Sequence, residues 1–114
     1  MSNRAKNIEV LNTIAKMCPN KPVHELYLLC VIADCTHASK HRASITGTQY
    51  YKERSDIMDA HVFYIIEWGT FGREIPQKYL SVEERATIEQ VCQNYGTLNH
   101  FQLFETALQK LGYA

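Results

Sequence analysis

A β-prone stretch, SITGTQYYKERSD at residues 44–56, interrupts a chain whose other segments follow helical patterns. Its β-branched residues favour extended backbone, and Gly47 between two threonines is a natural turn point. We therefore predict an extended segment or a small β-hairpin near residues 44–54. The fold class expected for the whole chain is mainly α, a compact helical bundle with one small β element.

Two helices are predicted before the interruption. Apolar side chains recur at helical spacing in residues 4–17, and CPNKP then breaks the pattern. In that break we expect Asn20 to be the N-cap of the next helix and Pro22 to lie in its first turn. The second helix is predicted over residues 23–41, with Leu28, Leu29, Ile32 and Cys35 on its apolar side.

The segment that follows the interruption has two possible structures. Ser55 is a candidate N-cap for a helix that runs to Trp68, with one apolar side that forms either core or a dimer face. The second half, VFYIIEW, is so rich in β-formers that a buried strand at residues 61–68 is the alternative. The next eleven residues, GTFGREIPQKY at 69–79, form a loop long enough for us to expect a functional role.

The last third carries the clearest helix signals. Ser81 with Glu84, and Asn99 with Gln102, have the spacing of capping boxes at two helix starts. Gly96 and Gly112 are expected at the two helix ends. The second of these helices has an apolar stripe of Phe101, Phe104, Leu108 and Leu111. The pattern thus predicts about five helices in a single domain over residues 1–114.

The charge balance and the length of the apolar runs limit the classes of function that we expect for the chain. Twelve Lys and Arg balance twelve Asp and Glu, which is not the profile of a strongly basic nucleic-acid binder. The basic segment 40–54, and the helix-turn-helix shape of YGTLNHFQLFETALQK, keep a nucleic-acid-binding regulator as the alternative function. The start of the chain has no apolar signal region, and no apolar run is long enough for a membrane span. We expect a cytoplasmic protein with free thiols and no membrane contact.

One cluster has metal-ligand residue types. Asp34, His37 and His41 lie on one helical stripe, and the two histidines have the i, i+4 spacing of zinc-binding helices. Ala38 stands where such motifs carry a catalytic Glu. A half-exposed polar face is the simpler interpretation. No nucleophile motif or phosphate-binding glycine loop is present. We expect no enzymatic activity, no metal and no cofactor.

Three stretches resemble a known family. LYLLCVIADCTHASKHR, SITGTQYYK and LSVEERATIEQVCQNYGTLNHFQLFETAL are similar, in order and spacing, to the pattern of the Panacea domain, the SocA-like or phage-associated antitoxin domain. Together they cover most of residues 24–110. Two family features are not matched: ERSD stands where a Gly-Pro pair is usual, and FETALQKLGYA lacks a Thr-His pair. The chain thus resembles a diverged or minimal member.

The resemblance implies a binding function without catalytic residues. Panacea domains are antitoxins that neutralise a partner toxin by direct contact, and they often occur in phages. We therefore expect a protein-binding inhibitor, either antitoxin-like or a phage counter-defence protein that blocks a host defence component. Tyr and Arg are typical interface anchors. The expected partner-binding residues are Tyr50, Tyr51, Lys52, Arg54, Phe71, Arg73 and Tyr79.

Overall fold

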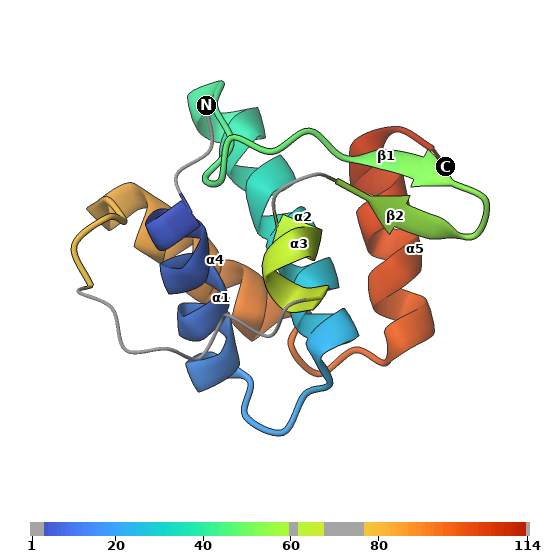
Figure 1. Ribbon diagram of the computed structural model, residues 1–114, viewed down its shortest axis with the longest axis horizontal. Coiled ribbons are helices and arrows are strands. Elements are labelled where there is room, and N and C mark those ends of the chain that lie inside the picture. The colour runs from blue at the N-terminus through green and yellow to red at the C-terminus, as the bar shows by residue number, and fades with distance from the viewer. Residues whose placement is uncertain (1–3, 60–61, 68–76, 114) are drawn as a thin grey trace.

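Five helices and one small antiparallel sheet make up the part of the chain that the computed structural model describes, which is residues 4–59, 62–67 and 77–113 (Figure 1). The elements are α1 (Arg4–Met17), α2 (Val23–His41), β1 (Tyr51–Glu53), β2 (Asp56–Met58), α3 (Val62–Glu67), α4 (Val82–Tyr95) and α5 (His100–Leu111). The expected fold class, mainly α with a small β element, is confirmed.

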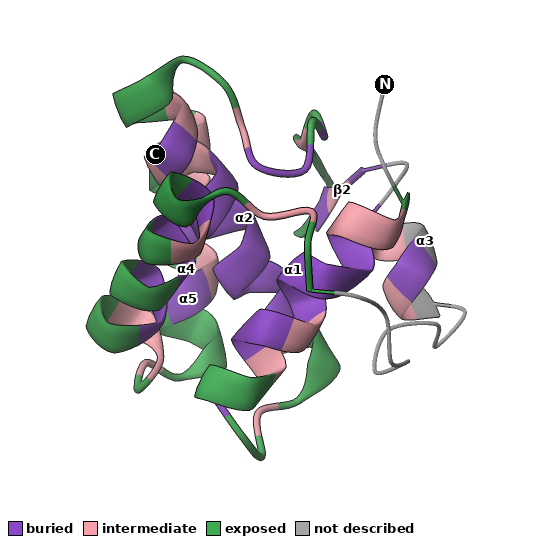
Figure 2. Ribbon diagram, turned by 90° about the vertical axis from the view of Figure 1, so that its left-hand side faces the viewer, coloured by how far each residue is buried: buried purple, intermediate pink, exposed green. Residues whose placement is uncertain are grey.

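Helix α2 is the centre of the fold, and α1, α3, α4 and α5 all contact it. Every residue from Leu26 to Asp34 is buried. Burial on all sides explains why the first half of α2 is apolar all round its axis instead of along one stripe. Figure 2 shows this purple stretch in the interior, while α4 and α5 carry exposed residues on their outer sides.

The hydrophobic core joins side chains from α1 to α5 and from β2. Its largest fully buried apolar members are Leu11, Ile14, Leu29, Ile32, Ile57, Ile65, Ile88 and Leu103. Val62 and Ile65 of α3 point into this core. The apolar side of α3 is therefore part of the core of the protein.

The β-hairpin lies later in the chain than the sequence predicts. β1 and β2 pair in the register Tyr51↔Met58, Lys52↔Ile57 and Glu53↔Asp56. The tight turn falls at residues 54–55, where Arg54 takes the left-handed conformation (φ 57°). Gly47 bends the preceding segment, with φ 71° and its N–H donated to the Ser44 hydroxyl, and does not form the hairpin turn.

The prediction that a helix starts at Ser55 is wrong. Residues 56–58 form β2, and α3 begins only at Val62. Its N-terminal amides are capped by Asp59, whose Oδ1 accepts hydrogen bonds from the N–H of Val62 (2.6 Å) and of Phe63 (3.2 Å). Both Ser and Asp are good N-cap residues, and pairing of β1 with β2 decides between them. The alternative of a strand is also wrong for residues 62–67, which are helical.

The helix boundaries predicted elsewhere are largely confirmed. Both capping boxes form: Ser81 with Glu84 at α4, and Asn99 with Gln102 at α5. The prediction for Asn20 is wrong, because this residue has φ 73° and lies in the turn before α2. Asn tolerates that conformation better than most residues, and Pro22 then occupies the N-cap position without a side-chain cap.

The four cysteines are free thiols, as the sequence predicts. No helix within the described ranges has the length and apolar character that crossing a membrane requires.

Candidate functional site

The hairpin carries three of the predicted partner-binding residues, Tyr51, Lys52 and Arg54. All six residues from Tyr51 to Asp56 are exposed, and Tyr51 keeps 49% of its surface accessible. Lys52 and Arg54 add positive charge beside it. Within the described residues the sheet has two strands, so each strand has one edge with no strand beside it.

A buried carboxylate holds the segment that leads into the hairpin. Asp34 of α2 is 2% exposed and accepts four hydrogen bonds. They come from the N–H of Ile45 (2.9 Å), the N–H and hydroxyl of Thr46 (3.0 and 2.5 Å) and the hydroxyl of Tyr50 (2.5 Å). Residues 45–50 are thus tied to α2 directly before β1 begins.

The electrostatics of this network fit a positioning role. Burial raises the pKa of Asp34, while the hydrogen bonds from Thr46 and Tyr50 oppose that rise. Burial, together with the nearby Cys30 and Asp34, raises the pKa of Tyr50 well above its ordinary value. The Tyr50 hydroxyl therefore stays protonated and remains a donor to Asp34.

A second set of buried contacts, centred on Tyr27 of α2, holds β2 and α3 in place. The Tyr27 hydroxyl donates to Asp59 Oδ2 (2.6 Å) and lies 3.2 Å from the carbonyl oxygen of Ile57. Burial and the Asp59 carboxylate raise the pKa of Tyr27, so the Tyr27 hydroxyl also stays protonated and remains a hydrogen-bond donor. The Tyr27 ring packs edge-on against Tyr50 and Phe63, with centroids 6.2 and 5.9 Å away. One side chain of α2 therefore contacts both sides of the hairpin and the start of α3.

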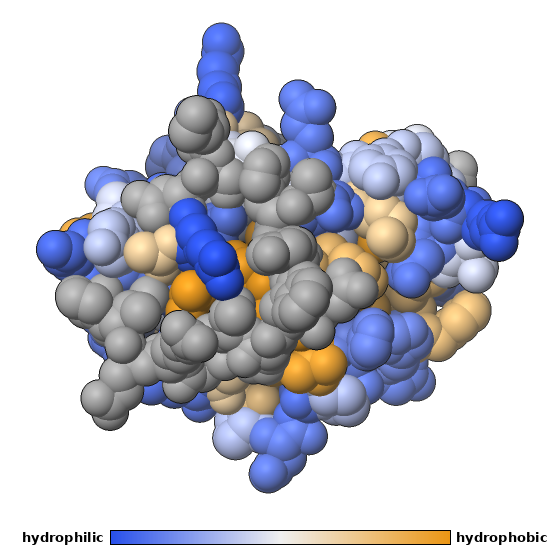
Figure 3. Space-filling model, in the orientation of Figure 1, coloured by the Kyte–Doolittle hydropathy of each residue, from blue (hydrophilic) through white to orange (hydrophobic). Residues whose placement is uncertain are grey.

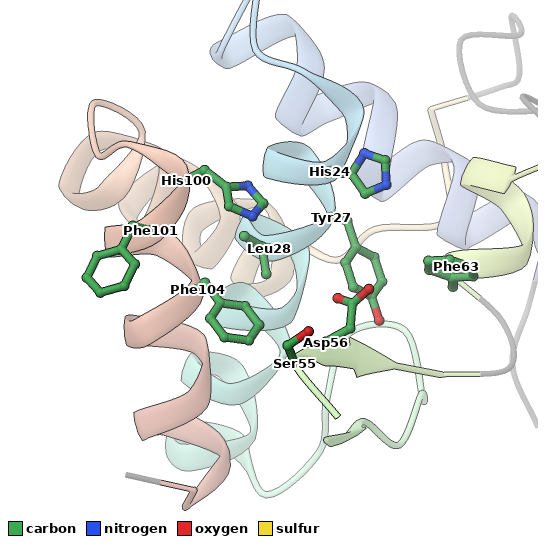
Figure 4. A pocket seen from close by; sticks show the side chains of 9 residues that line it. All are labelled: His24, Tyr27, Leu28, Ser55, Asp56, Phe63, His100, Phe101 and Phe104. Atoms are coloured by element: carbon green, nitrogen blue, oxygen red, sulfur yellow. The ribbon is translucent and has the colours of Figure 1, made fainter. Parts of the chain in front are cut away.

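Beside the hairpin turn lies a groove of about 240 Å³, which we call the aromatic groove. It is lined by His24, Tyr27, Leu28, Ser55, Asp56, Phe63, His100, Phe101 and Phe104. Figure 4 shows the Asp56 carboxylate next to the Tyr27 ring, with Phe63 on the α3 side and Phe104 on the α5 side. Phe101 stands at the outer rim and is 66% exposed, which is unusual for a Phe.

The hairpin and the aromatic groove form one continuous surface, because Ser55 and Asp56 belong to both. We call residues 51–56 together with the groove lining the hairpin–groove surface. On the right-hand side of Figure 3, where the hairpin and α5 lie, a few pale orange residues lie among hydrophilic blue ones. A mixture of aromatic, apolar and charged groups is typical of protein interfaces.

The structure places the predicted partner-binding residues in different surroundings. Tyr51, Lys52 and Arg54 are exposed on the hairpin, whereas Tyr50 is half-buried with its hydroxyl on Asp34. Phe71 and Arg73, and most of the loop expected to be functional, lie outside the described residues.

Tyr79 lies apart from the hairpin. It is half-buried, and its N–H donates to the buried carboxylate of Glu9 in α1 (2.9 Å). Figure 1 shows the segment at residues 77–80 on the side of the molecule opposite the hairpin. The structure therefore brings three of the predicted residues together and separates Tyr79 from them.

Sequence patterns did not point to the α5 side of the groove. Phe101 and Phe104 belong to the predicted apolar stripe, but Leu103 and Ala107 are the α5 residues that are buried. One signal was available: α5 has more apolar positions than one buried face needs, so some must remain accessible. His24 and His100 gave no signal, because they line the groove only through the packing of α5 on α2.

Two of the three residues considered for metal binding, Asp34 and His37, have hydrogen-bond partners outside the cluster. Asp34 binds the 45–50 segment, and His37 places its Nδ1 2.6 Å from the Ala43 carbonyl oxygen. The His37 and His41 rings lie against each other, with centroids 4.5 Å apart. In the described part of the chain no group of three or more His, Cys, Asp or Glu has the arrangement of a metal site.

Comparison of this chain with protein-family models, with curated proteins and with solved structures finds no match.

Proposed function

We propose that this protein is a non-enzymatic, protein-binding inhibitor, antitoxin-like or a phage counter-defence protein, that neutralises a partner by direct contact. The observation that carries the proposal is the hairpin–groove surface, where Phe101 lines the groove and the hairpin beside it exposes Tyr51, Lys52 and Arg54. The sequence resemblance to the Panacea domain supports the same class of function.

The physical support comes from how interfaces gain affinity. Large aromatic residues and Arg contribute most when a partner buries them, while surrounding residues exclude water. Tyr51 and Phe101 offer apolar area that water now covers. Within the described residues β1 is exposed and pairs on one side only, so a partner strand could add to its other edge by backbone hydrogen bonding.

The positioning of this surface supports the proposal further. Asp34 and Tyr27 tie the residues on both sides of the hairpin to α2. A surface held in one conformation loses less entropy on binding than a free loop. We therefore place the principal contacts on the hairpin–groove surface.

The test is capture of the partner with matched variants. The tagged protein is used to isolate bound proteins from host cells or from cells that express defence systems, and they are identified by mass. We expect one protein at a near one-to-one ratio with the wild type and with the control Val82→Ala, which changes an exposed residue of α4. Combined Tyr51→Ala and Arg54→Ala is expected to weaken binding at least about tenfold.

The nature of the partner separates the two forms of the proposal. A partner that is toxic when expressed alone, and harmless with this protein, identifies an antitoxin, and a defence-complex subunit identifies counter-defence. Unchanged capture by the double variant would rule out the hairpin as the interface. Retention of DNA at low salt that is lost at moderate salt, with no protein captured, would favour the nucleic-acid alternative.

A further inference from the structure

The size of the aromatic groove limits what it can hold. Small-molecule sites usually enclose about 300–1,000 Å³. The groove measures about 240 Å³ and is open to the surface beside the hairpin turn. That volume suits one inserted side chain better than a cofactor or metabolite, and hot-spot residues commonly fill pockets of this kind at interfaces.

The chemistry of the groove favours a cation. The rings of Tyr27, Phe63 and Phe104 line it, and aromatic ring faces attract positive charge. Among the described residues that line the groove, Asp56 is the one that is formally charged when the histidines are neutral. Its Oδ1 accepts the N–H of Ile57 (2.9 Å), which fixes the direction of the carboxylate. Among the described residues no Lys or Arg is in an ion pair with it.

The register of the hairpin is an independent reason to expect a cation in the groove. Glu53 of β1 lies directly opposite Asp56 of β2. Two like charges at facing positions of an antiparallel pair repel each other. A cation bound at Asp56 would reduce this repulsion, whereas an anionic group would increase it. Lys52 and Arg54 lie on the same hairpin but do not line the groove.

We infer that the aromatic groove binds the side chain of an arginine on the partner protein, with Asp56 as its counter-ion. A planar guanidinium stacks on aromatic rings and forms two parallel hydrogen bonds to a carboxylate. An apolar side chain would bury the Asp56 charge with no cation beside it, which is costly. The inference rests on the proposed function only in placing this arginine on a protein.

The test needs no partner. Wild-type protein labelled with ¹⁵N is titrated with N-acetyl-arginine methylamide and with its uncharged isostere, N-acetyl-citrulline methylamide, and amide shifts are followed by NMR. We expect shifts at Asp56, Leu28 and Phe104 with arginine, and at least about tenfold weaker binding of citrulline. Asp56→Asn is expected to weaken arginine binding at least about fivefold.

Glu53→Gln is the matched control. It removes the same charge from the same hairpin without changing the groove lining, so it should weaken binding less than Asp56→Asn does. Equal binding of arginine and citrulline, or equal loss in the two variants, would overturn the inference. A failed capture experiment would leave this titration unaffected, and a failed titration would leave the hairpin interface standing.

Discussion

Asp34 is a single residue whose hydrogen bonds decide where a whole segment lies. Its carboxylate accepts two backbone N–H groups and two hydroxyl groups from residues 45–50. Because the site is buried, removal of the carboxylate would leave these four donors without water to replace it. The Asp34 carboxylate therefore contributes to stability mainly because it pairs four buried donors. Leaving those donors unpaired would cost more free energy than the hydrogen bonds themselves contribute.

Replacement of Asp34 should be strongly destabilising. We expect Asp34→Ala to lower the free energy of unfolding by about 3 kcal/mol, measured by urea denaturation followed by circular dichroism. The control is Asp56→Ala, which changes an exposed carboxylate and should stay within about 0.5 kcal/mol of the wild type. Equal effects of the two variants would show that the Asp34 network contributes little.

Helix α3 shows how an element depends on its contacts. It has six residues, which is far below the length at which an isolated helix is stable in water. Asp59 caps its first amides and also accepts the Tyr27 hydroxyl, while Val62 and Ile65 enter the core. The helix therefore exists because of its cap and its burial, since its β-prone sequence favours a different structure.

Loss of this cap should loosen α3 selectively. We expect Asp59→Ala to speed hydrogen exchange at the amides of Ile65 and Ile66 at least about tenfold, as measured by NMR. Ser81→Ala is the matched control, because it removes the cap of α4 instead. It should leave exchange in α3 as in the wild type. Unchanged exchange in Asp59→Ala would mean that packing alone maintains α3.

At the scale of the whole molecule, buried acids of α1 and α4 connect distant parts of the chain. Glu9 accepts hydrogen bonds from the Tyr79 N–H and from Arg85 Nη2 (2.9 and 3.0 Å). Glu84 accepts from Lys6 Nζ (2.6 Å) and from the Ser81 N–H (2.8 Å). These contacts hold the start of α4 against α1 at a sequence separation of more than 65 residues.

The contact of Lys6 with Glu84 should make stability depend on pH. Burial disfavours the Glu84 carboxylate, but the bonds from Lys6 and Ser81 prevail and lower its pKa. A lowered pKa in the folded state stabilises the protein above the unfolded value, about 4.3 for Glu, and this contribution is lost as the pH falls through the folded value.

The variant Glu84→Gln isolates that charge, since its amide oxygen still accepts from Ser81. We expect it to be about 1 kcal/mol less stable than the wild type at pH 7, with the difference shrinking towards pH 3. Urea denaturation at both pH values measures it. Glu89→Gln, on the exposed side of α4, should differ little at either pH. A stability difference between Glu84→Gln and the wild type that stays constant with pH would contradict the role of the Glu84 charge.

Local chemistry made much of the fold predictable. The capping boxes at Ser81 and Asn99, and the bounds of α1 and α2, follow from side chains and backbone groups within a few residues of one another. The β-branched run at residues 44–48 predicts a β element between α2 and α3, but the strands form later, at residues 51–53 and 56–58. Tyr51 and Arg54, which the sequence predicts as partner-binding residues, are both exposed.

The remaining features depend on contacts between residues far apart in the sequence. Ser55 and Asp59 are equally good N-caps, and only the pairing of β1 with β2 places the helix start after Asp59. The aromatic groove combines α2, the hairpin, α3 and α5, which no local pattern relates. Propensity and spacing act over a few residues, whereas packing on α2 decides which side chains share a surface.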